Sequence, residues 1–339
     1  MAAERLRLGF LGVGWIGRHR MQALLESGLA EAIALADPAA DCLDAAAQLA
    51  PAAARCQDLA QLLALPLDGI VIATPSASHA AQSIAALEHG LAVFCQKPLG
   101  RSAAEVAGVL EAAARADRRL GVDLSYRHLA GMDAARALVA EGALGRVHAM
   151  ELVFHNAYGP DKPWFRNRAL AGGGCVMDLG IHLVDLALWL AGGTAVTGVT
   201  SRCYAGGVPL RDVSDAVEDY ATARLDLADG TAVDLACSWN LPIGVDAEIR
   251  ARVFGSKGAI TLRNVDGSFY DFVIEQHGGG QHRVLGSPPD AWGGRAAVAW
   301  AREVLDGRGH DADGATGLLA VAGALDAIYR SEMERGRGQ

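Results

Sequence analysis

The sequence has no lysine- or arginine-rich cluster, no C-x-x-C pair and no low-complexity linker. Its formal net charge is −9 at pH 7, so we expect neither nucleic acid nor an anionic membrane as a partner. No apolar run looks long enough to span a bilayer. The first apolar run begins within about six residues of the N-terminus, which leaves no room for a signal peptide. These absences favour a cytoplasmic location.

The cysteines are scattered along the chain without the spacing of a metal site. They stand at Cys42, Cys56, Cys95, Cys175, Cys203 and Cys237. This spacing predicts reduced, buried thiols rather than a disulfide framework or a zinc site, and we expect no metal. With 339 residues, 51% of them hydrophobic, the chain is long enough for two domains and a large core.

Short apolar runs alternate with alanine-rich helical stretches in the first third of the chain. The strand-like runs are 6–11, 32–36, 69–73, 91–95 and 120–124, and the helical stretches are 18–27, 41–49, 58–63, 78–88 and 103–116. Continuous apolar strands separated by helices predict a parallel sheet covered on both faces. Ser102 and Glu105 form an S-x-x-E capping box where the last of these helices begins. We expect an α/β dinucleotide-binding domain over residues 1–125.

After residue 125 the pattern changes from alternation to a run of strands. Helices are predicted at 129–141, 176–190, 291–305 and 316–332, and strands at 197–204, 217–227, 231–239, 248–254, 259–262 and 268–275. Asp229-Gly230 is typical of a two-residue hairpin loop. Successive strands without intervening helices predict a mostly antiparallel sheet. Residues 126–334 are therefore expected to form a second α/β domain that binds the substrate.

The first apolar run ends in a glycine-rich segment, Gly12-Val13-Gly14-Trp15-Ile16-Gly17. This is the G-x-G-x-x-G spacing, placed between a strand and a helix. In a dinucleotide site, Gly12 makes the tight turn, Gly14 lets a pyrophosphate approach the backbone, and Gly17 lets the helix pack closely. We expect the whole segment, Trp15 and Ile16 included, to bind the cofactor at the helix N-terminus.

A carboxylate, Asp37, ends the next apolar run, 20 residues after Gly17. At this place an NAD-binding domain holds the adenosine ribose hydroxyls. No arginine or lysine follows closely, so a 2′-phosphate would meet no nearby cation in the sequence. We therefore predict NAD rather than NADP. The alternative is a glycine turn of another α/β fold, with Asp37 an ordinary strand-end residue.

Two polar turns, Thr74-Pro75-Ser76 and Cys95-Gln96-Lys97-Pro98, follow predicted strands. Turns at the carboxyl edge of a parallel sheet face the ligand crevice, so Thr74, Pro75, Gln96 and Lys97 are candidate cofactor contacts. A lysine there places an ammonium group beside a hydroxyl that loses a proton. The Lys97-Pro98 bond is a candidate for the cis form. His79 is either a further cofactor contact or a histidine on the helix surface.

A triple glycine, 172–174, precedes the apolar helix predicted at 176–190. Asp178, His182 and Asp185 follow at i, i+4 and i+7, which places them on one stripe. Ionisable groups on a buried helix are costly unless they pair or face a cavity. His182, flanked by carboxylates, is a candidate general base. The alternative is a paired structural trio with Asp178 as helix cap. The glycines favour function, because they permit close approach of the backbone.

Taken together, these segments resemble the Gfo/Idh/MocA family, the group of glucose–fructose oxidoreductase and inositol dehydrogenase. The matching segments are Gly12–Gly17, Asp37, Thr74-Pro75, Lys97-Pro98 and Gly174-x-x-x-Asp178-x-Gly180-x-His182. The resemblance covers nearly the whole chain. It implies an N-terminal Rossmann domain and a C-terminal α/β domain with a large open sheet. The exposed face of that sheet is commonly an oligomer interface in the family, which implies a homodimer or homotetramer.

The resemblance also implies reversible oxidation of a secondary alcohol on a sugar or cyclic polyol. By motif, Lys97 lies between nicotinamide and substrate and assists deprotonation of the hydroxyl. His182 is then the general base, and Asp178 binds a neighbouring hydroxyl. The family usually has Glu-Lys-Pro where this chain has Gln96-Lys97-Pro98, and this change removes a negative charge beside the lysine. We expect Lys97 to lose its proton more readily here than in a Gln96→Glu variant, with a different pH–rate profile.

Substrate contacts outside these motifs are less sharply predicted, since each candidate could equally serve packing or the surface. They are Tyr126, Arg127, Asn156, Trp164, Arg166 and Trp239. Residues 156–166 are expected to form a substrate-covering loop. The sequence shows no dedicated phosphate-binding cluster, so we expect a neutral sugar or polyol.

Two other functions fit the same sequence. One is an NAD-dependent glycoside hydrolase, in which the cofactor oxidises and then reduces the same sugar; glycoside cleavage without accumulation of NADH would indicate it. The other is a non-catalytic dinucleotide-binding sensor. The presence of Lys97, Asp178 and His182 argues against a sensor, which has no need of all three.

Overall fold

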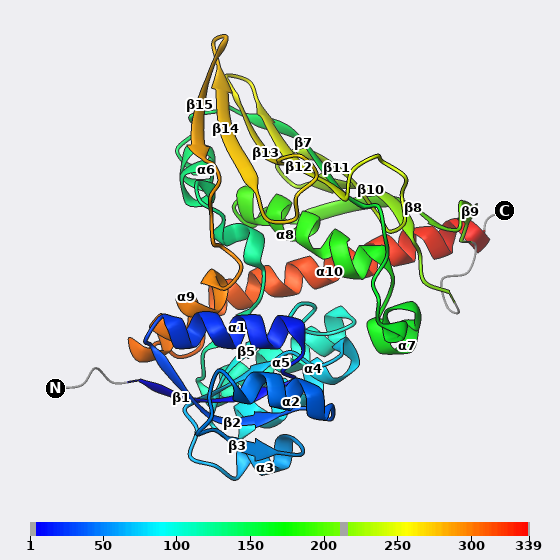
Figure 1. The fold of residues 1–339 in the computed structure, drawn as a ribbon. Coiled ribbons are helices and arrows are strands. Elements are labelled where there is room, and N and C mark those ends of the chain that lie inside the picture. Colours follow the sequence, from blue (N-terminus) through cyan, green and yellow to red (C-terminus); the bar gives the residue numbers. More distant parts are fainter. Residues whose placement is uncertain (1–4, 211–215, 338–339) are drawn as a thin grey trace. The chain divides into compact units, whose positions relative to one another are not determined.

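The computed structural model describes residues 5–210 and 216–337, which form two compact units (Figure 1). The first unit holds the described residues of Met1–Ser125 together with Gly293–Ala315. The second holds those of Tyr126–Trp292 together with Thr316–Gln339. Each unit is thus completed by a segment from the C-terminal part of the chain.

A six-stranded parallel sheet in the order β3-β2-β1-β4-β5-β6 forms the centre of the first unit. Its elements are β1 (Leu6–Leu11), α1 (Trp15–Glu26), β2 (Ala30–Ala36), α2 (Ala40–Ala47), β3 (Ala54–Cys56), α3 (Leu59–Leu63), β4 (Gly69–Ile72), α4 (Ser76–Glu88), β5 (Ala92–Cys95), α5 (Ala103–Ala116) and β6 (Leu120–Val122). The strand order reverses at β1. Because β-α-β crossovers are right-handed, α1 and α2 cover one face and α4 and α5 the other. The predicted Rossmann-type sheet is confirmed.

The sequence locates the start of one helix of this unit by its cap and misses one of its strands. The helix α5 begins where the capping box predicts, and Ser102 Oγ accepts a hydrogen bond from Glu105 N at 3.2 Å. The strand β3 was not predicted, because three residues at the edge of a sheet make too short an apolar run to stand out.

The helix α9 (Arg295–Leu305) belongs to the first unit, although the sequence analysis places residues 126–334 in the second domain. Trp300 of this helix is buried, and its ring lies 5.8 Å from that of Phe94 between centroids. Gly121 leaves room for the indole, since a Cβ there would lie 2.8 Å from it. Burial of one large aromatic side chain therefore attaches α9 to the first sheet.

A nine-stranded sheet in the order β15-β14-β13-β12-β7-β11-β10-β8-β9 dominates the second unit (Figure 1). The elements are η1 (Ser125–His128, at the boundary), α6 (Met132–Ala140), β7 (Val147–Asn156), η2 (Pro163–Arg166), α7 (Arg168–Ala171), η3 (Val176–Gly180), α8 (Ile181–Leu190), β8 (Val196–Ala205), β9 (Val208–Pro209), β10 (Tyr220–Leu227), β11 (Ala232–Ser238), β12 (Ala247–Gly255), β13 (Ala259–Asn264), β14 (Phe272–Gly278), β15 (Gln281–Gly286) and α10 (Ala312–Arg337). Within the described strands, β11 and β7 run parallel and the other neighbours are antiparallel. The predicted mostly antiparallel sheet is confirmed.

Three strands of this sheet are missing from the sequence prediction. The strand β7 lies between β12 and β11, near the middle of the sheet, and β15 and β9 lie at its two edges. In β7, Met150, Leu152 and Phe154 are buried, while Glu151 is exposed on the opposite face. The polar residues of β7 obscure this alternation in the sequence. Asn156 therefore ends a strand and does not lie in a loop, as was expected.

The hairpin predicted at Asp229-Gly230 connects β10 to β11. Leu227 N donates to Thr231 O at 2.9 Å, so three residues lie in the loop instead of the expected two. Gly230 has φ +88°, which is the left-handed conformation that three-residue hairpin loops require at this place.

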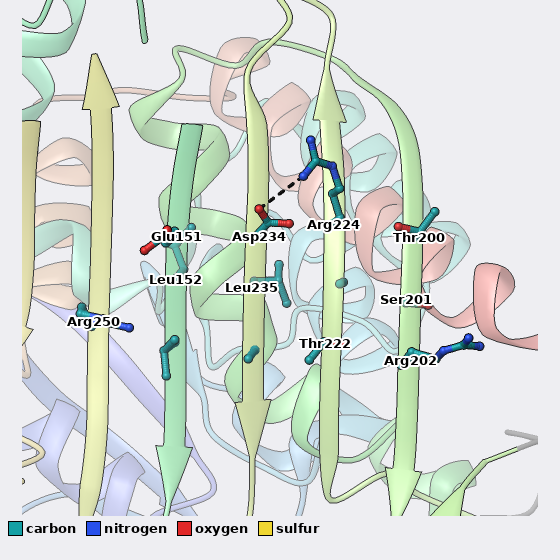
Figure 2. A pocket seen from close by; sticks show the side chains of 13 residues that line it. Glu151, Leu152, Thr200, Ser201, Arg202, Thr222, Arg224, Asp234, Leu235 and Arg250 are labelled. Atoms are coloured by element: carbon teal, nitrogen blue, oxygen red, sulfur yellow. Dashed lines mark hydrogen bonds and ion pairs between the residues drawn. The ribbon is translucent and has the colours of Figure 1, made fainter. Parts of the chain in front are cut away.

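The sheet of the second unit has an apolar face and a polar face. Apolar side chains of β7, β10, β11 and β12 share a core with α8 and α10. The opposite face carries a shallow hollow, in which Val153, Ala236 and Thr222 lie between Arg202 and Arg250 (Figure 2). The residues predicted for the site are not among those that line it.

One segment, Arg168–Leu190, is long and apolar enough to cross a membrane, with a mean hydropathy of 1.4 in its most apolar window. This corrects the expectation that no run reaches that length. However, 89% of the window is buried inside the protein. Burial in the core of the second unit thus accounts for the apolar composition of this segment.

The six cysteines all lie in the described residues and carry free thiols. Cys42 is half-buried and the other five are buried. Burial raises the pKa of Cys95 to about 12, which keeps this thiol protonated at neutral pH.

Candidate functional site

The glycine-rich turn between β1 and α1 has the backbone geometry that a dinucleotide site needs. Gly12 has φ +83°, and a Cβ there would lie 2.6 Å from the carbonyl group of Ala73. A Cβ on Gly17 would lie 2.0 Å from Gly12 O, so the helix packs directly on the turn. Gly14 differs: among the described residues, nothing lies within 4 Å of its Cβ position. The turn is therefore closed at Gly12 and Gly17 and open at Gly14.

Asp37 lies beside this turn, because β1 and β2 are paired and Leu11 is opposite Ala36. Its Oδ2 accepts from Val13 N at 2.8 Å, and its Oδ1 accepts from Ala39 N at 2.9 Å. Each carboxylate oxygen can accept a further hydrogen bond, so the group can also bind ribose hydroxyls. Trp15, the first residue of α1, is 63% exposed, and Ile16 is half-buried.

The polar turn after β4 is held by side chains of α4. Thr74 Oγ1 donates to Gln82 Oε1 at 2.6 Å, and Pro75 is the N-cap residue of α4. His79 is buried, which excludes the alternative of a surface histidine. Its Nδ1 lies 2.7 Å from Pro98 O and its Nε2 lies 2.6 Å from Thr74 O. Both ring nitrogens are thus used to join the two polar turns.

Burial lowers the pKa of His79, and the positive charge of Lys97 lowers it further, while the two carbonyl contacts oppose the shift. His79 therefore lies close enough to Lys97 for the lysine charge to affect the pKa of the imidazole. The Lys97-Pro98 bond is cis, as predicted. Gln96, before the lysine, is buried, and its Nε2 donates to Asp123 Oδ2 at 2.5 Å. The sequence analysis missed Asp123, because nothing in a linear pattern pairs it with Gln96.

In the second unit, Asp178 lies in a π-helical turn, η3, and not in a regular helix as predicted. Such turns occur often at functional sites. Trp239 Nε1 donates to Asp178 Oδ2 at 3.1 Å. Between Val176 and Leu188, Asp178 and His182 are the two residues that are not buried. Two polar side chains thus reach the surface from a segment that is otherwise core.

Aromatic side chains surround these two residues. The Tyr126 ring meets the His182 ring edge-on at 4.9 Å between centroids. Burial raises the pKa of Tyr126, and the negative charge of Asp178 raises it further. The indole of Trp239, which contacts Asp178, meets the Phe165 ring edge-on at 6.3 Å between centroids. The structure therefore brings Tyr126 and Trp239 to the Asp178–His182 pair.

Asp185 does not share the surroundings of Asp178 and His182. It is buried, and Arg127 Nε donates to its Oδ2 at 2.9 Å, with a second contact from Nη2 to Oδ1. Burial raises the pKa of Asp185, and the charge of Arg127 opposes this shift. The expected single stripe of three ionisable groups is therefore wrong. Arg127 is thus paired with a buried carboxylate, while its own side chain stays 26% exposed.

Two further candidates for substrate contact, Trp164 and Arg166, lie on η2. Trp164 stacks on Phe165 with 3.8 Å between ring centroids, which connects it through Phe165 to Trp239. Arg166 is exposed, and its Nη2 lies 2.9 Å from the Cβ position of Gly159. The structure thus places Trp164 on the side of Trp239, whereas Arg166 reaches solvent.

The triple glycine before η3 allows close approach, but to groups of the protein itself. A Cβ on Gly173 would lie 1.8 Å from Tyr329 Oη, and one on Gly174 would lie 1.9 Å from Glu218 O. Glu218 Oε1 accepts from Gly174 N and Val176 N, each at 2.9 Å, and from Tyr329 Oη at 2.8 Å. Glu218 Oε2 has no hydrogen-bond partner in the described part of the chain. The glycines serve this buried carboxyl group, which corrects the functional reading of them.

Replacing Glu218 by glutamine is expected to remove a pH dependence of stability. Burial raises the pKa of Glu218, so the folded state favours its protonated form. That contribution is complete below the unfolded-state value of about 4.3 and is lost as pH rises through the folded-state value. Urea unfolding from about pH 4 to about pH 8 should show the wild type losing free energy of unfolding relative to Glu218→Gln. Parallel curves for the two proteins would contradict this.

Comparisons with known proteins found a matching family for each of the two units. Residues 6–124 match an oxidoreductase family with an NAD-binding Rossmann fold, and residues 132–261 match the GFO/IDH/MocA C-terminal domain. The rhizopine catabolism protein MocA of Rhizobium meliloti is 30% identical over 81% of this chain and 88% of its own length. The chain belongs to the Gfo/Idh/MocA family. The predicted resemblance is thereby confirmed.

Two further similar proteins come from the same comparisons. Inositol 2-dehydrogenase of Rhizobium meliloti strain 1021 is 27% identical over 76% of each chain. The structure of GenD2 from gentamicin A biosynthesis, in complex with NAD, has a TM-score of 0.80 and 25% identity, and the match covers 98% of this chain and 95% of that one. The present protein, as a member of the Gfo/Idh/MocA family, is an oxidoreductase with an NAD-binding domain.

The glycine-rich turn of the first unit is suited to the pyrophosphate of NAD. A pyrophosphate needs an open backbone at a helix N-terminus, and Gly14, the N-cap residue of α1, supplies it. Gly14→Ala is therefore expected to weaken NADH binding at least about tenfold, while the free energy of unfolding changes by less than about 1 kcal/mol. Titration of the intrinsic fluorescence with NADH measures the first effect and thermal unfolding the second. Unchanged affinity would place the pyrophosphate elsewhere.

Proposed function

We propose that this protein is an NAD(H)-dependent dehydrogenase or reductase that acts on a secondary hydroxyl of a neutral sugar or cyclic polyol. The observation that carries the proposal is the pair Asp178 and His182, whose side chains reach the surface from an otherwise buried segment. Ionisable side chains on an otherwise buried helix are unfavourable unless they are paired or face a cavity, and a substrate cavity suits both a carboxylate and an imidazole. The named relatives in the family, such as inositol 2-dehydrogenase, support the substrate class.

The substrate end of the site suits neighbouring hydroxyl groups. Asp178 is oriented by the indole of Trp239, which donates to Oδ2 at 3.1 Å, and its carboxylate can accept hydrogen bonds from a substrate hydroxyl. His182, four residues on, can take the proton from the hydroxyl next to it. The edge of the Tyr126 ring limits the rotation of that imidazole, since the rings are 4.9 Å apart. A carboxylate and a base side by side match the adjacent hydroxyls of a polyol.

Lys97 completes the proposed chemistry from the first unit. We propose that Lys97 and His182 serve the same hydroxyl: the imidazole accepts its proton, and the ammonium group stabilises the negative charge that develops on the oxygen. The bound nicotinamide supplies the acceptor for the hydride of the carbinol carbon. In the direction of reduction, His182 returns the proton. Asp37 holds the ribose of the cofactor, and the open backbone at Gly14 holds its pyrophosphate.

The surroundings of Arg127 and Arg166 indicate whether the site would favour a neutral or an anionic substrate. Arg127 and Arg166 are the candidate substrate contacts that could hold a phosphate or carboxylate. Arg127 is paired with Asp185, and Arg166 is exposed and is the single arginine or lysine of η2. This arrangement supports a neutral substrate over an anionic one.

The decisive experiment mixes the purified protein with NAD⁺ or NADP⁺ and a panel of inositols, aldoses and glycosides, and follows the absorbance of reduced nicotinamide. We expect NADH to form with one group of polyols or sugars. Preference for NADP⁺ would contradict the role of Asp37. Cleavage of a glycoside without net NADH would indicate the hydrolase instead. NADH binding without turnover of any compound, in either direction, would indicate a sensor.

A further inference from the structure

The residue before Lys97 is joined to a carboxylate that no motif points to. Cys95 and Val122 are paired in the parallel strands β5 and β6, so Gln96 and Asp123 are the next residues on two adjacent strand ends. Asp123 N donates to Cys95 O at 3.0 Å, which continues the pairing by one residue. Both side chains are buried. The two residues therefore meet because the sheet places them side by side.

The Asp123 carboxylate accepts three hydrogen bonds from side chains at this place. Its Oδ2 accepts from Gln96 Nε2 and from Arg20 Nε, each at 2.5 Å. Its Oδ1 accepts from the Ser125 hydroxyl. Arg20 is buried as well, and its charge balances that of Asp123. A buried carboxylate with three donors, one of them a cation, is a rigid anchor, because removal of any partner leaves a buried polar group unsatisfied.

Lys97 lies between two anchored neighbours. On one side, Gln96 N donates to Ile72 O at 2.8 Å, and the Gln96 side chain is held by Asp123. On the other side, Pro98 O lies 2.7 Å from His79 Nδ1. The backbone that carries the lysine is thus held before and after the residue.

Position 96 departs from the Glu-Lys-Pro pattern of the family, and Asp123 explains why the change is tolerated. A glutamate at position 96 would face the Asp123 carboxylate at hydrogen-bonding distance, and two carboxylates there would repel each other. Glutamine offers the N–H donor that a carboxylate partner requires. The chain keeps one negative charge beside the lysine turn, on Asp123 instead of residue 96.

We propose that Asp123 is a positioning residue for Lys97: through the Gln96 amide it fixes the lysine turn, and the Gln96–Asp123 pair takes the place of the glutamate in the family pattern. This proposal rests on the proposed function, since Lys97 must act at the reacting hydroxyl. It also revises the expectation from the sequence that the negative charge is lost.

The test compares Gln96→Glu, Asp123→Asn and the double variant that exchanges the two groups. In Gln96→Glu, a shared proton can bridge the carboxylates at low pH, so we expect activity close to wild type there and a loss of kcat that grows to about tenfold or more as pH rises. In Asp123→Asn, we expect a similar loss that does not grow with pH. The exchange restores one carboxylate and one amide, so kcat should return to within about threefold of the wild type, with its pH profile.

The ionisable groups around the pair belong to the strands and helices packed against it. They are His19 and Arg20 of α1, His79 of α4, Cys95 of β5, and Lys97. All of them are kept in the three variants, so a pH-dependent difference reports on the exchanged pair itself.

Two controls distinguish failure of the proposed function from failure of the positioning role. Lys97→Ala tests the proposed function: full activity in this variant would remove the basis of the inference. If Lys97→Ala is inactive but the double variant is no better than the single ones, the positioning role is wrong. Thermal unfolding and the KM for NAD⁺ are measured for each variant. Single variants that lose thermal stability and keep the wild-type kcat and pH profile would likewise overturn the proposal.

Discussion

Replacing His182 by alanine is expected to lower kcat about 10²- to 10⁴-fold, with a smaller change in KM for the substrate. The imidazole reaches the surface from an otherwise buried segment and lies 4.9 Å from the Tyr126 ring, so its loss removes the proposed base without opening the core. Lys97→Ala is expected to give a comparable loss, since the developing negative charge on the hydroxyl oxygen then has no ammonium partner. Steady-state kinetics with the substrate identified from the panel measure both effects.

Matched controls exist in the chain for both substitutions. His148 is an exposed histidine on β7, and Lys257 is an exposed lysine between β12 and β13. Alanine at either position should leave kcat within about twofold of the wild type, as expected for surface substitutions. If His182→Ala behaves like His148→Ala, the imidazole is not the base. If Lys97→Ala behaves like Lys257→Ala, the lysine has no part in the reaction.

Arg127→Ala is expected to destabilise the protein by about 3 kcal/mol, because it leaves the buried carboxylate of Asp185 without its cation. Burial already raises the pKa of Asp185, and loss of the arginine removes the charge that opposes this shift. Asp185 should then take up a proton on folding, so the deficit should be smaller at low pH than at neutral pH. Urea unfolding of the wild type and the variant at two pH values measures both effects.

Arg136 provides the control for this prediction, since it lies over the same indole. Its Cζ is 4.8 Å from the centroid of the Trp189 ring, and that of Arg127 is 5.8 Å away. Arg136 is exposed, so Arg136→Ala should cost less than about 1 kcal/mol. Equal costs for the two variants would show that the contact with Trp189, and not the ion pair with Asp185, holds Arg127.

Local sequence patterns were sufficient for five of the six strands of the first sheet and for its glycine-rich turn. Parallel strands buried on both faces read as continuous apolar runs, and the glycine spacing between β1 and α1 reflects steric needs within one turn. Asp37, the cis bond before Pro98 and the cap at Ser102 depend on neighbours in the sequence or on the end of a strand, so each could be located without the fold. The family could be recognised for the same reason, since its motifs are short and contiguous.

Only the tertiary structure shows which groups the polar side chains pair with. Asp178, His182 and Asp185 have helical spacing, but the π-helical turn and the position of Arg127 decide that Asp185 belongs to the core and the other two to the surface. The triple glycine looked suited to a ligand, whereas the fold uses it to bury Glu218.

In the same way, the sequence alone determined that Lys97 follows a strand in a family motif, and only the sheet brought Asp123 to Gln96, 27 residues away along the chain. The physical reason is that apolar periodicity and turn chemistry are local properties, whereas the ionic and hydrogen-bonding partners of a buried group are chosen by packing between distant segments.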